Sequence, residues 1–484
     1  MHKVFNCLLI SIIVQSLIAL PQTKEFDGIL TAEWLTEWGF DSSTTYMYLA
    51  SKGISSIAPG TFETFTNVDY LELQGNSIET LIAGTFKGLT KLISLTLNRN
   101  SISYIHDDVF TDTSNLEYLD LYRNSITSIS TKTFKGLNNL ILLDLYFNLI
   151  ADIEDGSFAH MGKLQVLDLS SNFIFDIYSN SLKGLKNLAY LDLYDNYLAT
   201  FEENAFLDLE NLLVLDLSYN VFLQTRSTDF VDLKNLEILN LALNEIGYLE
   251  DNSFSSLGNL VTLYLDKNNL YKLQKSNFAG LKNLDYLDLS FNDIIEIEAN
   301  SFCEMKDLGY LDLQFNYVEY IESQSFKCLS KLTYLDLWYN DVVNIDDFSF
   351  TDLVSLEVID LDNNQIAVIE PNTFHGLNAL VVLYLGYNQI QFIASNVFES
   401  LTAIQELYLY TNNIVFIHKN EFRDLSSLVI LHLTRNNLSF LDDNFVQGCV
   451  NLEELCLKGN PFSINPMFNF SGVLNLDPDS IFDC

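Results

Sequence analysis

Leucines alternate with polar or aromatic residues in short segments along most of the chain. In the stretch KLTYLDLWYN, Leu335 and Leu337 alternate with Tyr334, Asp336 and Trp338. A period of two predicts a short strand with one aliphatic face and one acidic, aromatic face. The aliphatic face is suited to a core. The use of the opposite face is the question that the sequence raises.

This alternating segment recurs at a constant interval of 24 residues. An asparagine marks each copy, without an insertion or deletion, at positions 76, 100, 124, 148, 172, 196, 220, 244, 268, 292, 316, 340, 364, 388, 412, 436 and 460. Around each asparagine the pattern is L-x-x-L-x-L-x-x-N-x-I/L-x-x-I/L, followed by F-x-x-L. Such a period predicts a solenoid in which each coil contacts only its neighbours.

Each recurring position of the repeat has a predicted physical role. The leucines five and three residues before the asparagine point into the core from strands that stack into one parallel sheet. The asparagine amide both donates and accepts, so it satisfies backbone groups at the turn after the strand. A phenylalanine ten residues after most asparagines, replaced by Leu182 and Val446, predicts a buried aromatic row behind the convex side.

The repeat and its phenylalanine row resemble the typical 24-residue leucine-rich repeats of animal extracellular proteins. Similar arrays form the ectodomains of Toll-type receptors, Slit and chaoptin-like adhesion proteins. The resemblance covers 47–462 and implies an α/β solenoid: a right-handed horseshoe with a parallel concave sheet and a largely non-helical convex side. It also implies binding of other macromolecules, usually proteins, without catalysis. Residues 24–61 lack the cysteines that often cap such arrays, and 463–470 lack the usual closely spaced ones.

The flanks of the array complete the predicted organisation. Residues 1–20, MHKVFNCLLISIIVQSLIAL, are typical of a signal peptide. Residues 21–46 are expected to cap the array with Trp34 and Trp38, the array of about 18 coils to occupy 47–462, and a tail to follow at 463–484. No second hydrophobic run is present, so we expect a secreted, extracellular protein without membrane insertion.

The formal net charge of -39 narrows the choice of partners. Such a chain repels nucleic acid phosphates and acidic membranes, so neither is an expected partner. It attracts cationic proteins or divalent cations, although acidity also serves solubility.

The outward face of three successive strands is the predicted partner-binding surface. Aromatic residues flanked by charge are typical of binding hot spots. The predicted contacts are Tyr286, Asp288, Tyr310, Asp312, Phe315, Tyr334, Asp336, Trp338 and Tyr339, with Phe291 bordering them. A weaker second patch consists of Tyr118, Asp120, Tyr122, Asp144, Tyr146, Asp192 and Tyr194. The aspartates have a second interpretation, solubility and protection against pairing between sheets. Stacked acids should also have raised pKa values or recruit a cation.

Cysteines and sequons carry further expectations for an oxidising compartment. Cys303 and Cys328 occupy nearly equivalent places on adjacent coils, which favours a disulfide over two buried thiols. Cys456 is expected to pair with Cys484 and leave Cys449 spare, although spacing does not determine this connectivity. Glycosylation is predicted at Asn437 and Asn469.

Catalysis finds little support in the sequence. His432 and Cys456 lie on neighbouring predicted strands, but no acid adjoins them and Cys456 has a disulfide use. No phosphate loop or metal motif is present, so neither an enzyme nor a cofactor is expected. Two functions remain. One is a secreted recognition or adhesion module, in innate immunity or guidance, that binds a cationic or amphipathic protein. The other is a matrix protein that self-associates or binds cationic polymers or calcium. Homodimerisation is possible, and an obligate dimer that buries the aromatic patch in the absence of other partners would favour the second function.

Overall fold

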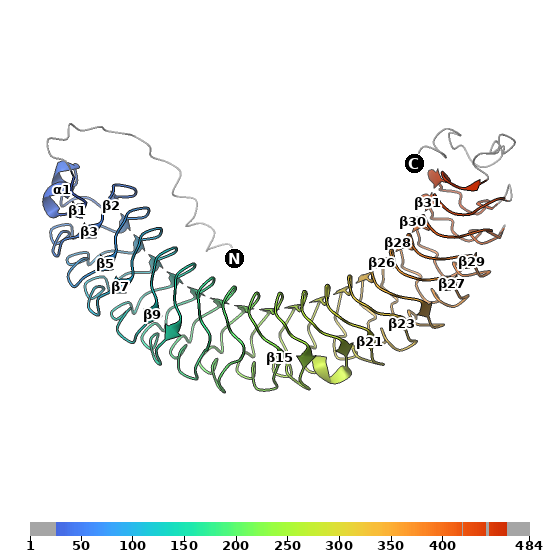
Figure 1. Cartoon of the computed structure of the whole chain (residues 1–484), viewed down its shortest axis with the longest axis horizontal. Coiled ribbons are helices and arrows are strands. Elements are labelled where there is room, and N and C mark those ends of the chain that lie inside the picture. The colour runs from blue at the N-terminus through green and yellow to red at the C-terminus, as the bar shows by residue number, and fades with distance from the viewer. Residues whose placement is uncertain (1–25, 419, 442–444, 462–484) are drawn as a thin grey trace.

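The protein is a curved solenoid, as the sequence predicted. A computed structural model describes residues 26–418, 420–441 and 445–461, so the predicted signal peptide at 1–20 and tail at 463–484 lie outside the described residues. Figure 1 shows an arc whose coils follow one another from the N-terminal to the C-terminal end. The predicted fold class is confirmed, with little helix and a parallel sheet on the concave side.

The concave sheet has eighteen short strands in the described residues, each paired in parallel with the strand 24 residues away. They are β2 (Tyr46–Tyr48), β4 (Tyr70–Glu72), β6 (Ser94–Thr96), β8 (Tyr118–Asp120), β10 (Leu142–Asp144), β12 (Val166–Asp168), β13 (Tyr190–Asp192), β14 (Val214–Asp216), β16 (Ile238–Asn240), β18 (Thr262–Tyr264), β20 (Tyr286–Asp288), β22 (Tyr310–Asp312), β24 (Tyr334–Asp336), β26 (Val358–Asp360), β28 (Val382–Tyr384), β30 (Glu406–Tyr408), β31 (Ile430–His432) and β32 (Glu454–Cys456).

The convex side consists of turns and two-residue strands that mostly pair with a neighbouring coil. They are β1 (Ile29–Leu30), β3 (Ser56–Ile57), β5 (Thr80–Leu81), β7 (Tyr104–Ile105), β9 (Ser128–Ile129), β11 (Asp152–Ile153), β15 (Gln224–Thr225), β17 (Tyr248–Leu249), β19 (Lys272–Leu273), β21 (Glu296–Ile297), β23 (Tyr320–Ile321), β25 (Asn344–Ile345), β27 (Val368–Ile369) and β29 (Phe392–Ile393). A 3-10 helix, η2 (Lys275–Phe278), interrupts them.

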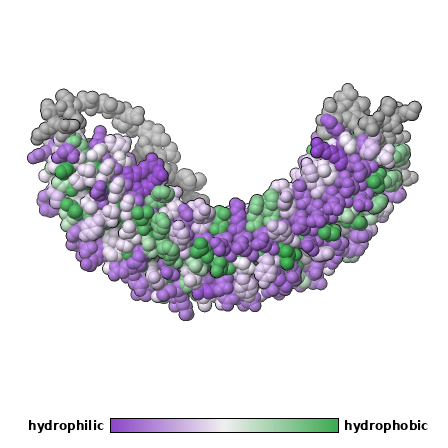
Figure 2. All heavy atoms as spheres, in the orientation of Figure 1, coloured by the Kyte–Doolittle hydropathy of each residue, from purple (hydrophilic) through white to green (hydrophobic). Residues whose placement is uncertain are grey.

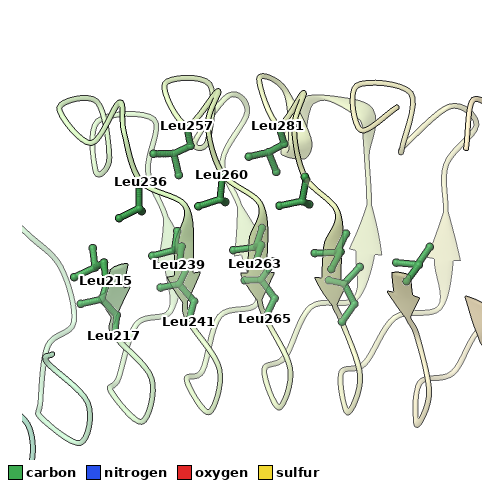
Figure 3. Packing of buried hydrophobic residues seen from close by; sticks show 14 of the residues in the cluster. Leu215, Leu217, Leu236, Leu239, Leu241, Leu257, Leu260, Leu263, Leu265 and Leu281 are labelled. Atoms are coloured by element: carbon green, nitrogen blue, oxygen red, sulfur yellow. The ribbon is translucent and has the colours of Figure 1, made fainter. Parts of the chain in front are cut away.

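The core is a set of aliphatic and aromatic columns that run along the arc. Figure 3 shows leucines such as Leu239 and Leu263 stacked from coil to coil, each at the same place on its strand. Behind them the phenylalanine rings stack in the same way. The rings of Phe302 and Phe326 are buried, with centroids 6.1 Å apart and planes 1° apart. The predicted aromatic row is therefore confirmed.

Asparagines tie each coil to its neighbours by side-chain hydrogen bonds. Asn340 Nδ2 donates to the carbonyl oxygens of Leu313 (2.9 Å) and Leu337 (3.2 Å), and its Oδ1 accepts from the Val318 N–H (3.1 Å). This ladder was predicted. A second asparagine row, at the start of the strands, was not: Asn235 Nδ2, for example, donates to the Glu210 carbonyl oxygen at 2.8 Å.

The N-terminal end of the core is covered by a short helix and three aromatic rings. Helix α1 (Ala32–Glu37) buries Leu35, and Thr31 Oγ1 accepts from the Trp34 N–H at its start. The Phe26 ring packs edge-on against Trp34 (5.2 Å) and Trp38 (5.3 Å), and all three partly cover the core. This covering keeps the first leucines out of water.

Candidate functional site

Three tyrosines form a stacked row on the concave face of β20, β22 and β24. Strand register places Tyr286 beside Tyr310 and Tyr310 beside Tyr334. Ring centroids are 4.7 Å apart in both pairs, with interplanar angles of 9° and 3°. All three side chains are half-buried, so part of each stacked ring remains open to the concave space.

The aspartates beside this row accept hydrogen bonds from backbone N–H groups. Asp288, Asp312 and Asp336 each accept, through Oδ1, the N–H of the residue two positions later, at 2.8–2.9 Å. The same hydrogen bond recurs at Asp120, Asp144, Asp168, Asp192, Asp216 and Asp360. This N–H follows the strand and has no partner on the next coil, so the carboxylate satisfies it.

Two of the predicted contact residues are not accessible to a partner. Asp312 and Asp336 are only 4% and 7% exposed. Gln314 Nε2 donates to Asp312 Oδ2 at 2.9 Å, and the Tyr334 hydroxyl donates to Asp336 Oδ2 at 3.3 Å. The expectation that these two carboxylates contact a partner is therefore corrected, because alternation assigns a residue to a face but does not measure how far its neighbours cover it.

Burial also raises the pKa values of Asp312 and Asp336. It raises the pKa of Asp312 to about 7, with the neighbouring Asp288 and Asp336 carboxylates adding to the rise and the Gln314 N–H opposing it. The pKa of Asp336 is raised by the same burial, against hydrogen bonds from the Trp338 N–H and the Tyr334 hydroxyl. Asp312 therefore carries only part of its charge at neutral pH and attracts a cation less strongly than an exposed acid does.

An open groove adjoins the tyrosine row where the strands end. It has a volume of about 500 Å³ and extends over four coils. It is lined by Phe291, Asn292, Asp293, Phe315, Asn316, Tyr317, Tyr339, Asn340, Asp341, Asn363, Asn364 and Gln365. We call it the flank groove. Its floor is the asparagine ladder, whose amides are already hydrogen-bonded, so the residues immediately before and after each asparagine form its walls.

Aromatic rings form the concave-side wall of the flank groove. Phe291 and Phe315 stack with centroids 4.3 Å apart, and Phe315 contacts both Trp338 and Tyr339 at 4.7 Å. The residues before the asparagines have positive φ angles, 51–55° for these rings, which direct the side chains outward. Phe291 is 43% exposed and Tyr339 54% exposed.

All nine predicted contact residues thus lie on three adjacent coils, and two of them, Phe315 and Tyr339, line the flank groove. Tyr317, Asp293 and Asp341, which form its opposite wall, were missed by the sequence reasoning. These residues could have been found by applying the interval of 24 to the position one residue after each asparagine.

A further exposed aromatic surface lies in the N-terminal half of the arc. Phe173 and Phe175 stack on Tyr197 at 5.7 and 5.2 Å, and all three are exposed. Figure 2 shows hydrophobic residues gathered left of centre and hydrophilic residues prevailing to the right. In the second predicted patch, Tyr122 and Tyr146 stack at 5.0 Å. These rings offer a second apolar contact area.

The cysteines occupy structural positions. Cys303 and Cys328 form a disulfide between adjacent coils. Cys456 is disulfide-bonded, and Cys484, the partner predicted for it, lies outside the described residues. Cys449 is a free, buried thiol whose pKa burial raises to about 12. His432 lies beside Cys456 in register, but a disulfide-bonded sulfur is no nucleophile.

Neither a metal-binding cluster nor a membrane-spanning helix is present in residues 26–418, 420–441 and 445–461. No group of three or more histidines, cysteines and acids there is arranged to hold a metal ion. No helix in that part of the chain is long and apolar enough to cross a bilayer.

Comparison with known families decides the classification. The leucine rich repeat family model matches in overlapping segments that together cover residues 42–318 and 330–462. The chain belongs to the leucine-rich repeat family. No curated protein sequence matches it.

Solved structures share the fold of this leucine-rich repeat protein. Toll of Drosophila, in the Toll–Spatzle complex, is 21% identical with a TM-score of 0.65; the match covers 83% of this chain and 52% of that one. The plant peptide hormone receptor RGFR1, in complex with RGF2, is 25% identical with a TM-score of 0.59, covering 84% and 66%. A leucine-rich repeat protein of Leptospira interrogans is 22% identical with a TM-score of 0.57, covering 91% and 92%. The chain matches about half the length of the Toll chain.

Proposed function

We propose that this protein is a secreted, protein-binding leucine-rich repeat scaffold that serves extracellular recognition, adhesion or innate immunity. Its partner, a cationic or amphipathic protein, contacts the tyrosine row and the flank groove. The observation that carries the proposal is the cluster of Phe291, Phe315, Trp338 and Tyr339 around an open groove of about 500 Å³. Exposed aromatic anchors of this kind typically supply most of the binding energy of a protein interface.

Four further facts support the proposal. Residues 1–20 have the composition of a signal peptide, and the disulfide between Cys303 and Cys328 suits an oxidising compartment. The net charge of -39 disfavours nucleic acid and favours a cationic protein. The Toll and RGFR1 structures are both complexes with a second molecule, Spatzle and RGF2.

Capture of a partner tests the proposal. The secreted chain would be immobilised and exposed to extracellular fluid and cell-surface extracts of its source. The test variant carries Tyr310→Ala, Tyr334→Ala and Trp338→Ala. The matched control carries Tyr104→Ala, Tyr248→Ala and Tyr320→Ala, which remove three exposed tyrosines from convex strands. Circular dichroism checks the fold of both.

The expected result is a protein that the wild type and the convex control retain and the concave variant loses. Equal retention by all three would place the binding surface elsewhere. No capture, together with a stable dimer in sedimentation, would favour the second function, a self-associating matrix protein, for which Phe173, Phe175 and Tyr197 offer a contact area.

A further inference from the structure

The residues that immediately precede the ladder asparagines form a row along the flank of the arc. At two places in this row, a cation of one coil lies over an aromatic ring of the next. Arg123 Cζ is 5.1 Å from the Phe147 centroid, and Lys267 Nζ is 5.7 Å from the Phe291 centroid. The row is therefore a place where this chain already stacks cations on rings.

The same row is interrupted beside the flank groove. Phe291, Phe315 and Tyr339 occupy it on three successive coils, with Lys267 at the N-terminal end of the stack. The next coil has Asn363 instead of a ring, and the coil after that has Tyr387. The gap is therefore one coil wide.

The dimensions of this gap suit a flat group. Neighbouring strands lie about 4.8 Å apart, so two coils separate Tyr339 from Tyr387 by roughly 10 Å. A planar group that contacts a ring on each side needs roughly 7–8 Å. Both tyrosines are open to solvent, with exposed fractions of 54% and 48%.

The charge around the gap favours a cation. Asp341, in the groove wall opposite Tyr339, accepts a hydrogen bond from Gln365 Nε2 through Oδ1 (2.7 Å), while within the described ranges its Oδ2 makes no hydrogen bond. Asp293 lines the groove as well, and no lysine or arginine is among the lining residues. A guanidinium group combines a flat face for stacking with donors for a carboxylate, whereas an ammonium group has no flat face.

We propose that the gap at Asn363 is a slot for an arginine side chain of the protein partner. The guanidinium stacks between Tyr339 and Tyr387 and donates to Asp341. The inference rests on the proposed function, because it assigns the arginine to the protein that the concave surface binds. It adds a specificity-determining contact that the tyrosine row does not supply.

A short peptide probes the slot directly. Acetyl-Gly-Gly-Arg-Gly-Gly-amide would be titrated into the full-length secreted protein and followed by ligand-observed saturation-transfer NMR. The matched probe replaces arginine by citrulline, which has the same shape without the charge. Saturation of the arginine side chain should exceed that of citrulline several-fold.

Asn363→Arg is the decisive variant, because it fills the slot with the chain's own guanidinium. The position tolerates arginine: Arg99, Arg123 and Arg435 occupy the same place in other coils with φ angles of 53–54°, against 57° for Asn363. Leu243→Arg is the control, since it adds the same charge at the same place of a coil that borders neither the groove nor Tyr387.

We expect Asn363→Arg to weaken binding of the arginine peptide roughly tenfold and Leu243→Arg to change it less than about twofold. Equal binding of the arginine and citrulline peptides, or of wild type and Asn363→Arg, would overturn the slot. The two proposals fail separately. Capture of a protein by wild type and Asn363→Arg alike would refute the slot alone. If Asn363→Arg prevents peptide binding but the triple variant of Tyr310, Tyr334 and Trp338 still captures the protein, the concave surface alone is refuted.

Discussion

At the scale of single residues, two polar side chains in most coils satisfy backbone groups that the fold leaves unpaired. The ladder asparagine uses both ends of its amide, so neither a pure donor nor a pure acceptor replaces it. The aspartate four residues earlier accepts the N–H of the residue two positions later. The aspartates of the concave face therefore stabilise the backbone by accepting hydrogen bonds, and their negative charge is a secondary property.

Asn340→Ala tests the ladder. The substitution leaves the Val318 N–H and the Leu313 and Leu337 carbonyl oxygens without their side-chain partner in a buried place. We expect a loss of roughly 1–3 kcal/mol in the free energy of unfolding, measured by urea denaturation. Asn269→Ala, at an exposed asparagine, is the control and should change the free energy by less than about 0.5 kcal/mol. A similar loss for both variants would contradict the role of the ladder.

The interval of 24 was enough to predict the inward leucines, the asparagine ladder and the phenylalanine row, because each follows from position within the repeat. The burial of Asp312 and Asp336 could not be predicted in this way. It depends on how the rings of Tyr310 and Tyr334 lie across the sheet, and spacing fixes a side chain's face but not its rotamer. The wall formed by Asp293 and Asp341 was missed because the residue after each asparagine varies in type from coil to coil, so the apolar pattern does not mark this position.

At the scale of elements, the strands bring like charges into register. Asp288, Asp312 and Asp336 are neighbours on β20, β22 and β24. Burial makes ionisation of Asp312 and Asp336 costly, which is why the pKa values of these two carboxyl groups rise. The sequence predicted the rise or a bound cation, and the pKa of Asp312, raised to about 7, agrees with the first alternative.

The raised pKa values predict a stability that falls with increasing pH. In the unfolded chain an aspartate releases its proton near pH 4, whereas in the native protein Asp312, Asp144 and Asp360 keep theirs to about 7. Between these values unfolding releases protons, so a rise in pH favours the unfolded state. The urea midpoint should therefore be higher at pH 5.5 than at pH 8 and level off above pH 8.

Asp312→Asn isolates one contribution to this slope. Asn240 shows that an asparagine fits the position, since its Oδ1 accepts from the Ala242 N–H at 3.0 Å and its Nδ2 donates to Asp216. The variant should lose less stability than the wild type between pH 5.5 and 8. A midpoint that rises with pH in the wild type would contradict the account of the acidic row.

At the scale of the whole molecule, the repeat produces a long arc whose concave face and flank are open along their length. Acid is spread over the surface, and the aromatic residues cluster at a few places, one of which borders the open flank groove. This distribution suits a partner that extends along several coils and presents both apolar and cationic groups.

Secretion predicts a modification that is easy to measure. Asn437 is exposed within the sequon Asn437-Leu438-Ser439, on the turn that follows a ladder asparagine. Chain secreted from animal cells should therefore carry a glycan there, which peptide-N-glycosidase removes and Asn437→Gln prevents. Asn469 lies outside the described residues and serves as an independent sequon. Chain retained inside the cell, with Asn437 unmodified, would contradict the extracellular assignment.

Side-chain oxidation footprinting of the wild-type chain, with and without the protein that it captures, tests the central claim most directly. Oxidation of Phe315, Trp338 and Tyr339 should fall several-fold in the complex, because the partner covers the flank groove. The convex tyrosines Tyr104 and Tyr248 should be oxidised to the same extent in both samples. Protection of the convex tyrosines, with Trp338 and Tyr339 still reactive, would contradict a binding surface on the concave side.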